Sequence, residues 1–299
     1  MIKKFFNYIE IKTKITSTFT FAMTIGFLLY HKQVINWKLT IIFFFSMFLF
    51  DLATTAINNY IDSKDNGQIL DFSRKTSLYI IYILFAISTV LGLYLAYLSD
   101  LVILATGAVC FLCGVLYTYG PVPISRQPLG EILSGFFYGV MIPFILMYIN
   151  TPSGTFLSYQ MSLESVYLKL QIAPIISLLL FAAIPFCLTA NIMLANNICD
   201  LEKDIKVKRF TLPYYIGEKA LPLFAGLYYA TYIATVLMVI FKILSPICLF
   251  SLLSIILVQK NINQFLKKQE KASTFMCSIK NFVIVMGANT TVIFISLFF

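Results

Sequence analysis

The sequence is short of charge, and this shortage decides the class of protein. Only 12% of its 299 residues are Asp, Glu, Lys or Arg and 60% are hydrophobic, whereas soluble domains carry roughly 25% charged residues. The composition excludes an ordinary soluble domain and predicts an integral membrane protein. Histidine is almost missing as well, with His31 alone in the chain, so a zinc site and a Ser/His/Asp triad are poor fits.

The six cysteines form no framework of paired spacings, so the sequence gives no indication of disulfides. Cys110 and Cys113 have the spacing of a CxxC motif, but they lie within the apolar run VCFLCGVLY and have no second ligand pair. We interpret both as small residues packed among helices and not as a metal or redox site.

Long apolar runs fill most of the chain. A helix crosses the hydrocarbon core with about 20 apolar residues, because its backbone polar groups must be satisfied within the segment. Such runs lie near 15–30, 38–60, 77–98, 101–119, 130–149, 172–198, 220–240, 243–259 and 281–298. They predict an all-α membrane protein of about nine transmembrane helices, in a single domain covering residues 1–299. We expect the 150–171 connection to form an interfacial helix.

The basic residues predict the orientation in the membrane. With nine spans and the N-terminus inside, 18 of the 22 Lys and Arg residues fall on one side, and the other side holds Lys32, Lys38, Lys169 and Lys242. Because Lys and Arg are enriched in cytoplasmic connections, the N-terminus and the 120–129, 200–219 and 260–280 connections are expected in the cytoplasm, and the C-terminus outside. The net charge of +9 favours anionic lipid and a multiply charged anionic substrate over nucleic acid as partners.

The few acidic residues are clustered. Seven of the thirteen occupy two short windows: Asp51, Asp62, Asp65, Asp71, Asp200, Glu202 and Asp204. Since a helix advances about 100° per residue, the second span presents one stripe made of Asp51, Asn58, Asp62 and Asp65. The end of the sixth span presents another, with Asn196, Asp200 and Asp204 spaced i, i+4, i+8.

Both windows have the composition of a magnesium–diphosphate site. Each holds an Asn-Asn pair followed by aspartates, and basic residues come next: Arg74 and Lys75 after the first window, and Lys203, Lys206, Lys208 and Arg209 after the second. Carboxylates at membrane depth usually face a cavity or an ion, and oxygen ligands suit Mg²⁺. Basic side chains neutralise phosphate oxygens. A solvated helix end is the alternative for either window alone, and it weakens when the two are considered together.

At this point the residues resemble a known family. The segments NNYIDSKD and NNICDLEKD are similar to the two aspartate-rich motifs of UbiA-type intramembrane prenyltransferases. The segments YGPVPISRQPLGEILSGFFYG and NNICDLEKDIKVKRFTLPYYIG are similar to the 1,4-dihydroxy-2-naphthoate prenyltransferase (MenA) branch. The resemblance covers nearly the whole chain and implies a helical bundle around a central cavity open to the cytoplasmic side.

The resemblance also implies an activity: transfer of a polyprenyl group from its diphosphate to 1,4-dihydroxy-2-naphthoate, with release of diphosphate and CO₂, to form demethylmenaquinone. Two Mg²⁺ ions would be held by Asp62, Asp65, Asp200 and Asp204, with Asn58 and Asn196 as further catalytic residues. Substrate binding is assigned to Asn59, Asn197, Lys208, Arg209, Arg74, Lys75, Arg126, Tyr119, Glu131 and Asp51. Tyr60, Phe72, Tyr117 and Tyr119 are candidates to shield an allylic cation.

Several assignments stay open at this stage. Arg126 binds a carboxylate or a phosphate, or is a solvated loop arginine. Glu131 orients a ring hydroxyl, or it only favours a helix N-terminus. Asp51 contacts a substrate hydroxyl, or it makes a structural hydrogen bond. Another acceptor such as 4-hydroxybenzoate, and a transporter whose intramembrane acids mark an ion pathway, are the alternative functions.

Overall fold

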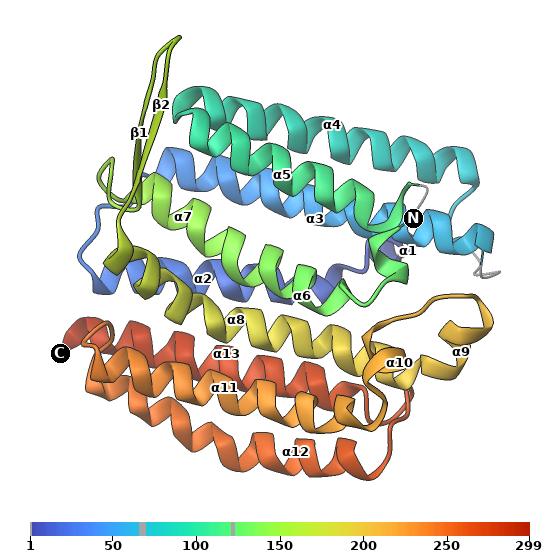
Figure 1. Cartoon of the computed structure of the whole chain (residues 1–299). Helices are drawn as coiled ribbons and strands as arrows, with labels where there is room; N and C mark the ends of the chain where they lie inside the picture. The colour runs from blue at the N-terminus through green and yellow to red at the C-terminus, as the bar shows by residue number, and fades with distance from the viewer. Residues whose placement is uncertain (1, 66–69, 121–122) are drawn as a thin grey trace.

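The computed structural model describes residues 2–65, 70–120 and 123–299, apart from the side chains of residues 64 and 65. Its helices lie side by side in one bundle, with the two termini at opposite ends (Figure 1). The α-helices are α1 (Ile2–Tyr8), α2 (Ile15–Tyr30), α3 (Trp37–Asp65), α4 (Arg74–Leu98), α5 (Leu101–Thr118), α6 (Gly130–Gly135), α7 (Ile142–Asn150), α8 (Ile172–Cys199), α9 (Leu201–Lys206), α10 (Leu212–Ile216), α11 (Ala220–Ile240), α12 (Ile255–Lys267) and α13 (Met276–Ile295). Tighter or wider turns form η1 (Ile11–Lys14), η2 (Ile124–Arg126), the π-helical η3 (Phe136–Met141), η4 (Gly217–Lys219), η5 (Pro246–Ser254) and η6 (Ser296–Phe298).

The prediction of an all-α membrane protein is confirmed. Within the described residues, eight segments are long and apolar enough to cross a membrane: Trp37–Ser63, Arg74–Leu98, Leu101–Thr118, Gly130–Tyr148, Ile172–Cys199, Leu212–Ile240, Pro246–Lys267 and Met276–Phe298. The remaining expected span, 15–30, is α2, whose 16 residues extend about 24 Å. It packs against α7 and α13. The count of nine stays a prediction.

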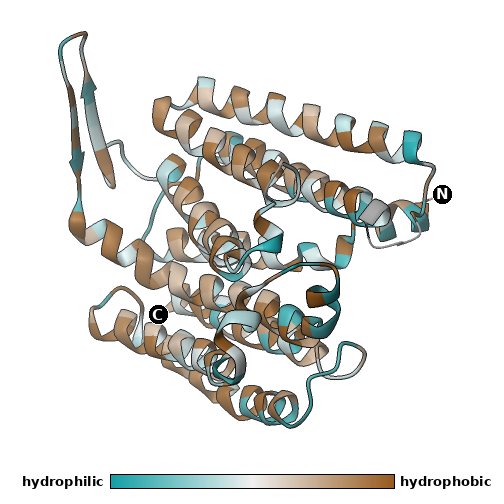
Figure 2. Ribbon diagram, turned by 45° about the vertical axis from the view of Figure 1, so that its right-hand side comes forward, coloured by the Kyte–Doolittle hydropathy of each residue, from teal (hydrophilic) through white to brown (hydrophobic). Residues whose placement is uncertain are grey.

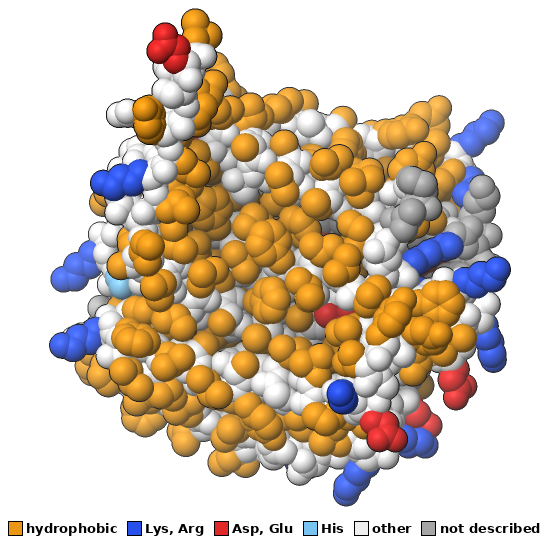
Figure 3. Space-filling view, viewed as in Figure 1, with side chains coloured by type: hydrophobic (Ala, Val, Ile, Leu, Met, Phe, Trp, Pro, Cys, Tyr) orange, Lys and Arg blue, Asp and Glu red, His pale blue; other side chains and the backbone are white. Residues whose placement is uncertain are grey.

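On the face shown in Figure 3, most Lys and Arg side chains lie at the two ends of the bundle. Hydrophobic residues cover most of the helix lengths in Figure 2, and the space-filling view shows Lys and Arg at both ends of a broad hydrophobic belt (Figure 3). The belt is the surface that lipid tails contact. The protein is therefore a multi-pass membrane protein.

Local sequence signals explain where the helices begin. The Asp100 carboxylate accepts hydrogen bonds from the backbone N–H groups of Val102 (2.9 Å) and Ile103 (3.2 Å), and so caps α5. Ser73 caps α4 in the same way by accepting from the N–H of Thr76. These caps set the two ends of the α4–α5 hairpin, whose helices pack on α3.

The N-terminal segment folds back onto α3. The Tyr8 hydroxyl donates to the Ala56 carbonyl (2.9 Å), and the Asn59 amide donates to the Tyr8 carbonyl (2.8 Å). Tyr8 and Ile9 are buried against Leu52, Ala53 and Ala56 in a small second core. This docking places η1, and with it Lys14, beside the middle of α3.

The 150–171 connection does not form the expected interfacial helix. It contains no helix and instead forms the antiparallel hairpin of β1 (Leu157–Met161) and β2 (Val166–Leu170), with Leu157 opposite Leu170. The hairpin stands at the left-hand end of the bundle, runs across the direction of the helices and projects past α4 (Figure 1). Aromatic and aliphatic residues alternate with polar ones along β1, a period typical of a strand and not of a helix.

Two glycines let η3 approach α8 closely. A Cβ at Gly139 would lie 2.3 Å from the backbone N and Cα of Phe186, and one at Gly135 would lie 2.9 Å from the Phe186 carbonyl oxygen. Since backbone atoms cannot give way as a flexible side chain can, these positions accept glycine only. The contact holds the wall that carries Tyr138 against α8.

We therefore expect Gly139→Ala to destabilise the fold by several kcal/mol, as overpacking into backbone does. The readout is the thermal midpoint of the purified protein in detergent. Gly226→Ala on α11 is the matched control, because its Cβ meets nothing within 4 Å, and it should leave the midpoint unchanged or slightly raised. Equal midpoints for the two variants would contradict the close packing.

Candidate active site

A cavity of about 260 Å³ lies between α3, α4, α5 and the α6–η3–α7 segment, and Met193 brings α8 into its wall. Its polar lining includes Asp51, Thr55, Asn58, Tyr117 and Tyr138. Most other lining residues are apolar, among them Phe43, Met47, Phe50, Phe111, Ile142 and Ile145. Cys110 and Cys113 also line it, both as free thiols, in agreement with their expected packing role. A molecule with a long apolar chain and a polar head would match this combination of apolar and polar lining residues.

The first acidic window lies at the end of α3. Asn58 lines the cavity, and its buried Oδ1 has no hydrogen-bond partner within the described part of the chain. Asp62 follows one turn later and is half-buried. Asp65 ends the helix, but its side chain lies outside the described residues. The neighbouring Asn59 amide is used to hold Tyr8.

The second acidic window lies where α8 passes into α9, at the same end of the bundle as the end of α3 (Figure 1). The Lys271 ammonium donates to Asp200 Oδ2 (2.6 Å) and to Asn196 Oδ1. Asp204 is 5% exposed, and its Oδ2 lacks a hydrogen bond among the described groups although Arg209 Nε is 3.9 Å away. Burial raises the pKa of the Asp204 carboxyl, and Arg209 opposes that shift.

Glu131 and Asn197 bridge α6 and α8. The Asn197 amide donates to Glu131 Oε1 (2.8 Å), while Glu131 Oε2 and Asn197 Oδ1 are buried without a described hydrogen-bond partner. Tyr117 faces the same region and donates to the sulfur of Met193 (3.8 Å). Two unsatisfied acceptor oxygens and a phenol therefore meet beside the second window.

Backbone contacts join the connections that carry Arg126 and Arg209. Arg209 Nε donates to the Ser125 carbonyl (2.8 Å), and the N–H of Phe210 donates to the Arg126 carbonyl (3.2 Å). The preceding Lys208 has a φ of 57°, which turns the chain sharply after α9. The predicted basic residues of two distant segments are brought together in this way.

The other predicted residues lie nearer the surface. Arg74 stacks over the Tyr60 ring (4.3 Å to the centroid) and donates to Ser63 Oγ (3.2 Å), which ties it to the end of α3. Lys75 is exposed. Tyr119 is 65% exposed and outside the cavity lining, whereas Tyr117 is in it.

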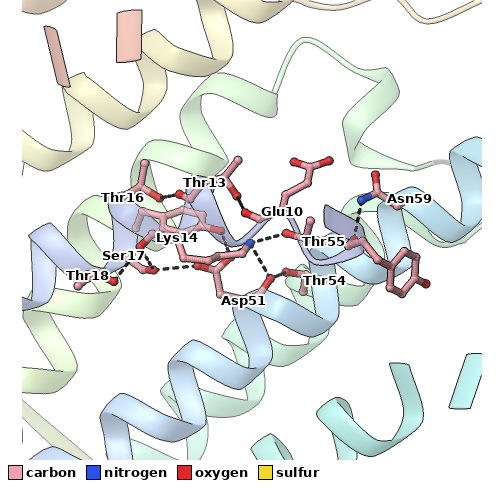
Figure 4. Close-up of polar contacts among 12 residues, drawn as sticks. Glu10, Thr13, Lys14, Thr16, Ser17, Thr18, Asp51, Thr54, Thr55 and Asn59 are labelled. Carbon is pink, nitrogen blue, oxygen red and sulfur yellow. Dashed lines mark hydrogen bonds and ion pairs between the residues drawn. The ribbon is translucent and has the colours of Figure 1, made fainter. Parts of the chain in front are cut away.

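Asp51 belongs to a buried polar network on the cavity wall (Figure 4). Lys14 Nζ lies 2.7 Å from Asp51 Oδ1 and also donates to the Asp51 carbonyl and to Thr55. Tyr138 donates to Oδ1 (2.6 Å) and Ser17 to Oδ2 (2.8 Å). Lys14, Ser17 and Tyr138 were not predicted from the sequence. The sequence feature that could have indicated Lys14 is the position of Asp51 within an apolar run. A carboxylate at that depth requires a cation, and Lys14 directly precedes the first apolar run.

The donor set fits Mg²⁺. No three His, Cys, Asp or Glu side chains cluster in the described ranges, and Mg²⁺ is typically held by one or two carboxylates with substrate phosphates and water. The buried oxygens Asn58 Oδ1 and Asp204 Oδ2 accept no hydrogen bond within the described part of the chain and are ligands of the required kind. Asn196 and Asp200 already bind a cationic group, the ammonium of Lys271.

The helical membrane bundle encloses an apolar cavity and gathers acid and amide oxygens at one end, an arrangement that suits a lipid-like molecule with a charged head. Comparison with known families agrees: the UbiA prenyltransferase family model matches residues 19–286. The chain belongs to the UbiA prenyltransferase family.

One curated relative is close enough to compare in sequence. A 1,4-dihydroxy-2-naphthoate octaprenyltransferase of Bacillus subtilis (strain 168) is 30% identical over 215 residues, which cover 68% of this chain and 63% of that protein. The match thus spans less than two thirds of the relative's length.

Solved structures share the fold over nearly the whole chain. The structure of a digeranylgeranylglyceryl phosphate synthase has a TM-score of 0.66 at 18% identity, covering 99% of this chain and 98% of that one. A UbiA homolog from Archaeoglobus fulgidus bound to GPP and Mg²⁺ has a TM-score of 0.63 at 14% identity, covering 99% and 100%.

Proposed function

We propose that this protein transfers a polyprenyl group from polyprenyl diphosphate to 1,4-dihydroxy-2-naphthoate, releasing diphosphate and CO₂ and forming demethylmenaquinone. The observation that carries the proposal is the cavity: Asn58 of the first acidic window and Met193, one turn before the second, line one chamber whose remaining wall is largely apolar. The naphthoate acceptor is supported by the Bacillus subtilis relative.

The donor's diphosphate is assigned to the end where both windows lie. Asp62, Asp65, Asp200 and Asp204, with Asn58 and Asn196, would hold Mg²⁺, for which we propose two ions. Bound there, Mg²⁺ offsets the charge of the diphosphate and stabilises it as a leaving group. Lys208 and Arg209 add donors to the departing oxygens, with Arg74 and Lys75 further out.

The acceptor is assigned to the inner wall. Asp51 and Tyr138 offer polar groups to a ring hydroxyl, and the Lys14 ammonium contacts the same Asp51 carboxylate. Glu131 Oε2 and Asn197 Oδ1, which accept no hydrogen bond from the described residues, supply further polar groups beside the second acidic window. Tyr117 shields the allylic carbon from water, and Phe43, Phe50 and Ile145 contact the isoprenoid tail. The distribution of Lys and Arg places the end of the bundle that holds both acidic windows on the cytoplasmic side.

The acceptor is tested by product analysis. The purified protein is supplied with one polyprenyl diphosphate, Mg²⁺ and either 1,4-dihydroxy-2-naphthoate or 4-hydroxybenzoate, and diphosphate release and product mass are recorded. We expect release with the naphthoate and a product that has lost the mass of CO₂. Diphosphate release with 4-hydroxybenzoate and not with the naphthoate would identify 4-hydroxybenzoate as the acceptor. No release with any aromatic acceptor would overturn the proposed reaction.

Arg209→Ala should raise the KM for the prenyl diphosphate by about tenfold to a hundredfold, because a hydrogen bond to a charged group contributes roughly 1.5–3 kcal/mol. The KM for the acceptor should change less. Lys206→Ala is the matched control, since Lys206 is exposed in the same segment and has no assigned role. The reverse order of the two effects would move Arg209 to the acceptor pocket.

A further inference from the structure

Lys271 reaches the second acidic window from a distant part of the chain. It belongs to the 268–275 connection between α12 and α13, 71 residues after Asp200. Its ammonium contacts Asp200 Oδ2 and Asn196 Oδ1. These oxygens are one turn apart on α8 and are the ones assigned to Mg²⁺. Lys271 has no part in the catalytic assignment made above.

The 268–275 connection is folded so that it presents this lysine. The Glu270 carbonyl accepts from the N–H groups of Thr274 (3.0 Å) and Phe275 (3.1 Å), and the Glu270 N–H donates to Thr274 Oγ1 (2.8 Å). Lys268 pairs with Glu270 at 2.6 Å. Because Glu270 is neutralised within the connection, Lys271 is left to pair with α8, and its ammonium lies 4.8 Å from the centre of the Phe275 ring.

The Lys271 ammonium is a cation that Mg²⁺ can replace at these oxygens. An ammonium is a compact point charge with three donors and binds the same hard oxygens that Mg²⁺ prefers. The side chains of Lys271 and Asp200 are 45% and 24% exposed, and ion pairs this accessible to water contribute little to stability. The contact is therefore weak enough to be exchanged for a divalent ion.

We propose that Lys271 is the counter-cation of the empty second window and a binding residue for the diphosphate once the window is loaded. Its ammonium would leave Asn196 and Asp200 when Mg²⁺ binds there, and would then pair with a diphosphate oxygen. The inference rests on the proposed function, since it takes prenyl diphosphate as the anion. It gives Lys271 opposite effects on two ligands: it weakens the binding of metal alone and strengthens the binding of the diphosphate.

Lys271→Gln separates these two effects. Without diphosphate, Mn²⁺ affinity measured by electron paramagnetic resonance should rise about fivefold to tenfold. With saturating Mg²⁺, the affinity for geranyl thiolodiphosphate, an unreactive analogue, should fall about tenfold. Lys267→Gln is the control: it removes one exposed positive charge at the end of α12, next to the same connection, without touching the Lys268–Glu270 pair, and it should change neither value. Unchanged or weaker Mn²⁺ binding in Lys271→Gln would overturn the inference, as would equal effects of the two variants.

A second measurement needs no substitution. In the unmodified protein, acylation of Lys271 by an amine-reactive reagent, followed by mass spectrometry, should be faster with Mg²⁺ than without it, while acylation of Lys268 stays constant. A Lys271 rate that does not respond to Mg²⁺ would count against the displacement. Neither measurement depends on prenyl transfer. Displacement of Lys271 in a protein that transfers to no acceptor would refute the proposed reaction and leave this inference standing. Prenyl transfer without displacement of Lys271 would refute this inference and leave the proposed reaction standing.

Discussion

Asp204→Asn is expected to lower kcat for prenyl transfer by about a thousandfold, the upper range for losing one group that stabilises transition-state charge. Asparagine keeps the shape of the side chain but is a weaker ligand for a divalent cation. Burial raises the pKa of Asp204, which means that the fold disfavours its ionised form. The neutral amide should therefore leave the thermal midpoint unchanged or raise it.

The combination of lost turnover with retained stability distinguishes a metal ligand from a structural residue. Turnover is measured as diphosphate release under saturating substrates, with the thermal midpoint recorded on the same preparation. Glu202→Gln is the matched control, because Glu202 is exposed on the same helical turn, and it should retain activity. Near-normal turnover in Asp204→Asn would remove Asp204 from the metal assignment.

Lys14→Met is expected to destabilise the protein by about 3–5 kcal/mol, the usual cost of removing one partner from a buried ion pair. The buried Asp51 carboxyl would then lose its cationic partner and retain Tyr138 and Ser17 as hydrogen-bond donors among its described partners. For a chain of this size the loss corresponds to a fall of roughly 10 °C in the thermal midpoint.

A double substitution separates the structural role of Asp51 from its proposed role at the acceptor. Lys14→Met combined with Asp51→Leu removes both charges, and the thermal midpoint should recover most of the loss, since apolar replacements of buried pairs are often neutral. If Asp51 binds a ring hydroxyl, the recovered protein should still have a raised KM for the naphthoate. A normal acceptor KM in the stable double variant would make the network purely structural.

The sequence predicted the features that depend on local pattern. Apolar runs located the spans, because a helix in lipid must satisfy its own backbone. The i, i+4, i+8 spacing predicted Asn196, Asp200 and Asp204 on one stripe at the end of the sixth span. In the structure α8 ends at Cys199, Asp200 is the turn residue that follows, and Asp204 lies on α9, so the stripe is divided between two helices. Where the pattern changed over a few residues, as in β1 and β2, the expectation of an interfacial helix was wrong. The span expected at 130–149 is present as Gly130–Tyr148 and includes the π turn η3.

Contacts between distant segments could not be predicted. Lys14 lies 37 residues from Asp51 and Lys271 lies 71 residues from Asp200, and nothing in either spacing selects those partners from the 22 basic residues. Tyr117 and Tyr119 were both predicted as candidates to shield an allylic cation, and of these two only Tyr117 lines the cavity, together with Cys110 and Gly114 of the same helix. Tyr119, two residues on, falls on a different face.

The central claim is that both acidic windows hold metal against one diphosphate, and a phosphorus-31 hyperfine measurement tests it most directly. Mn²⁺ and geranyl thiolodiphosphate are bound to the unsubstituted protein, to Asp62→Ala and to Asp200→Ala, and the coupling between manganese and phosphorus is recorded in each. We expect a clear coupling in the unsubstituted protein and its loss or marked change in both variants. A coupling that stays the same in either variant would show that its window takes no part in binding the metal–diphosphate complex.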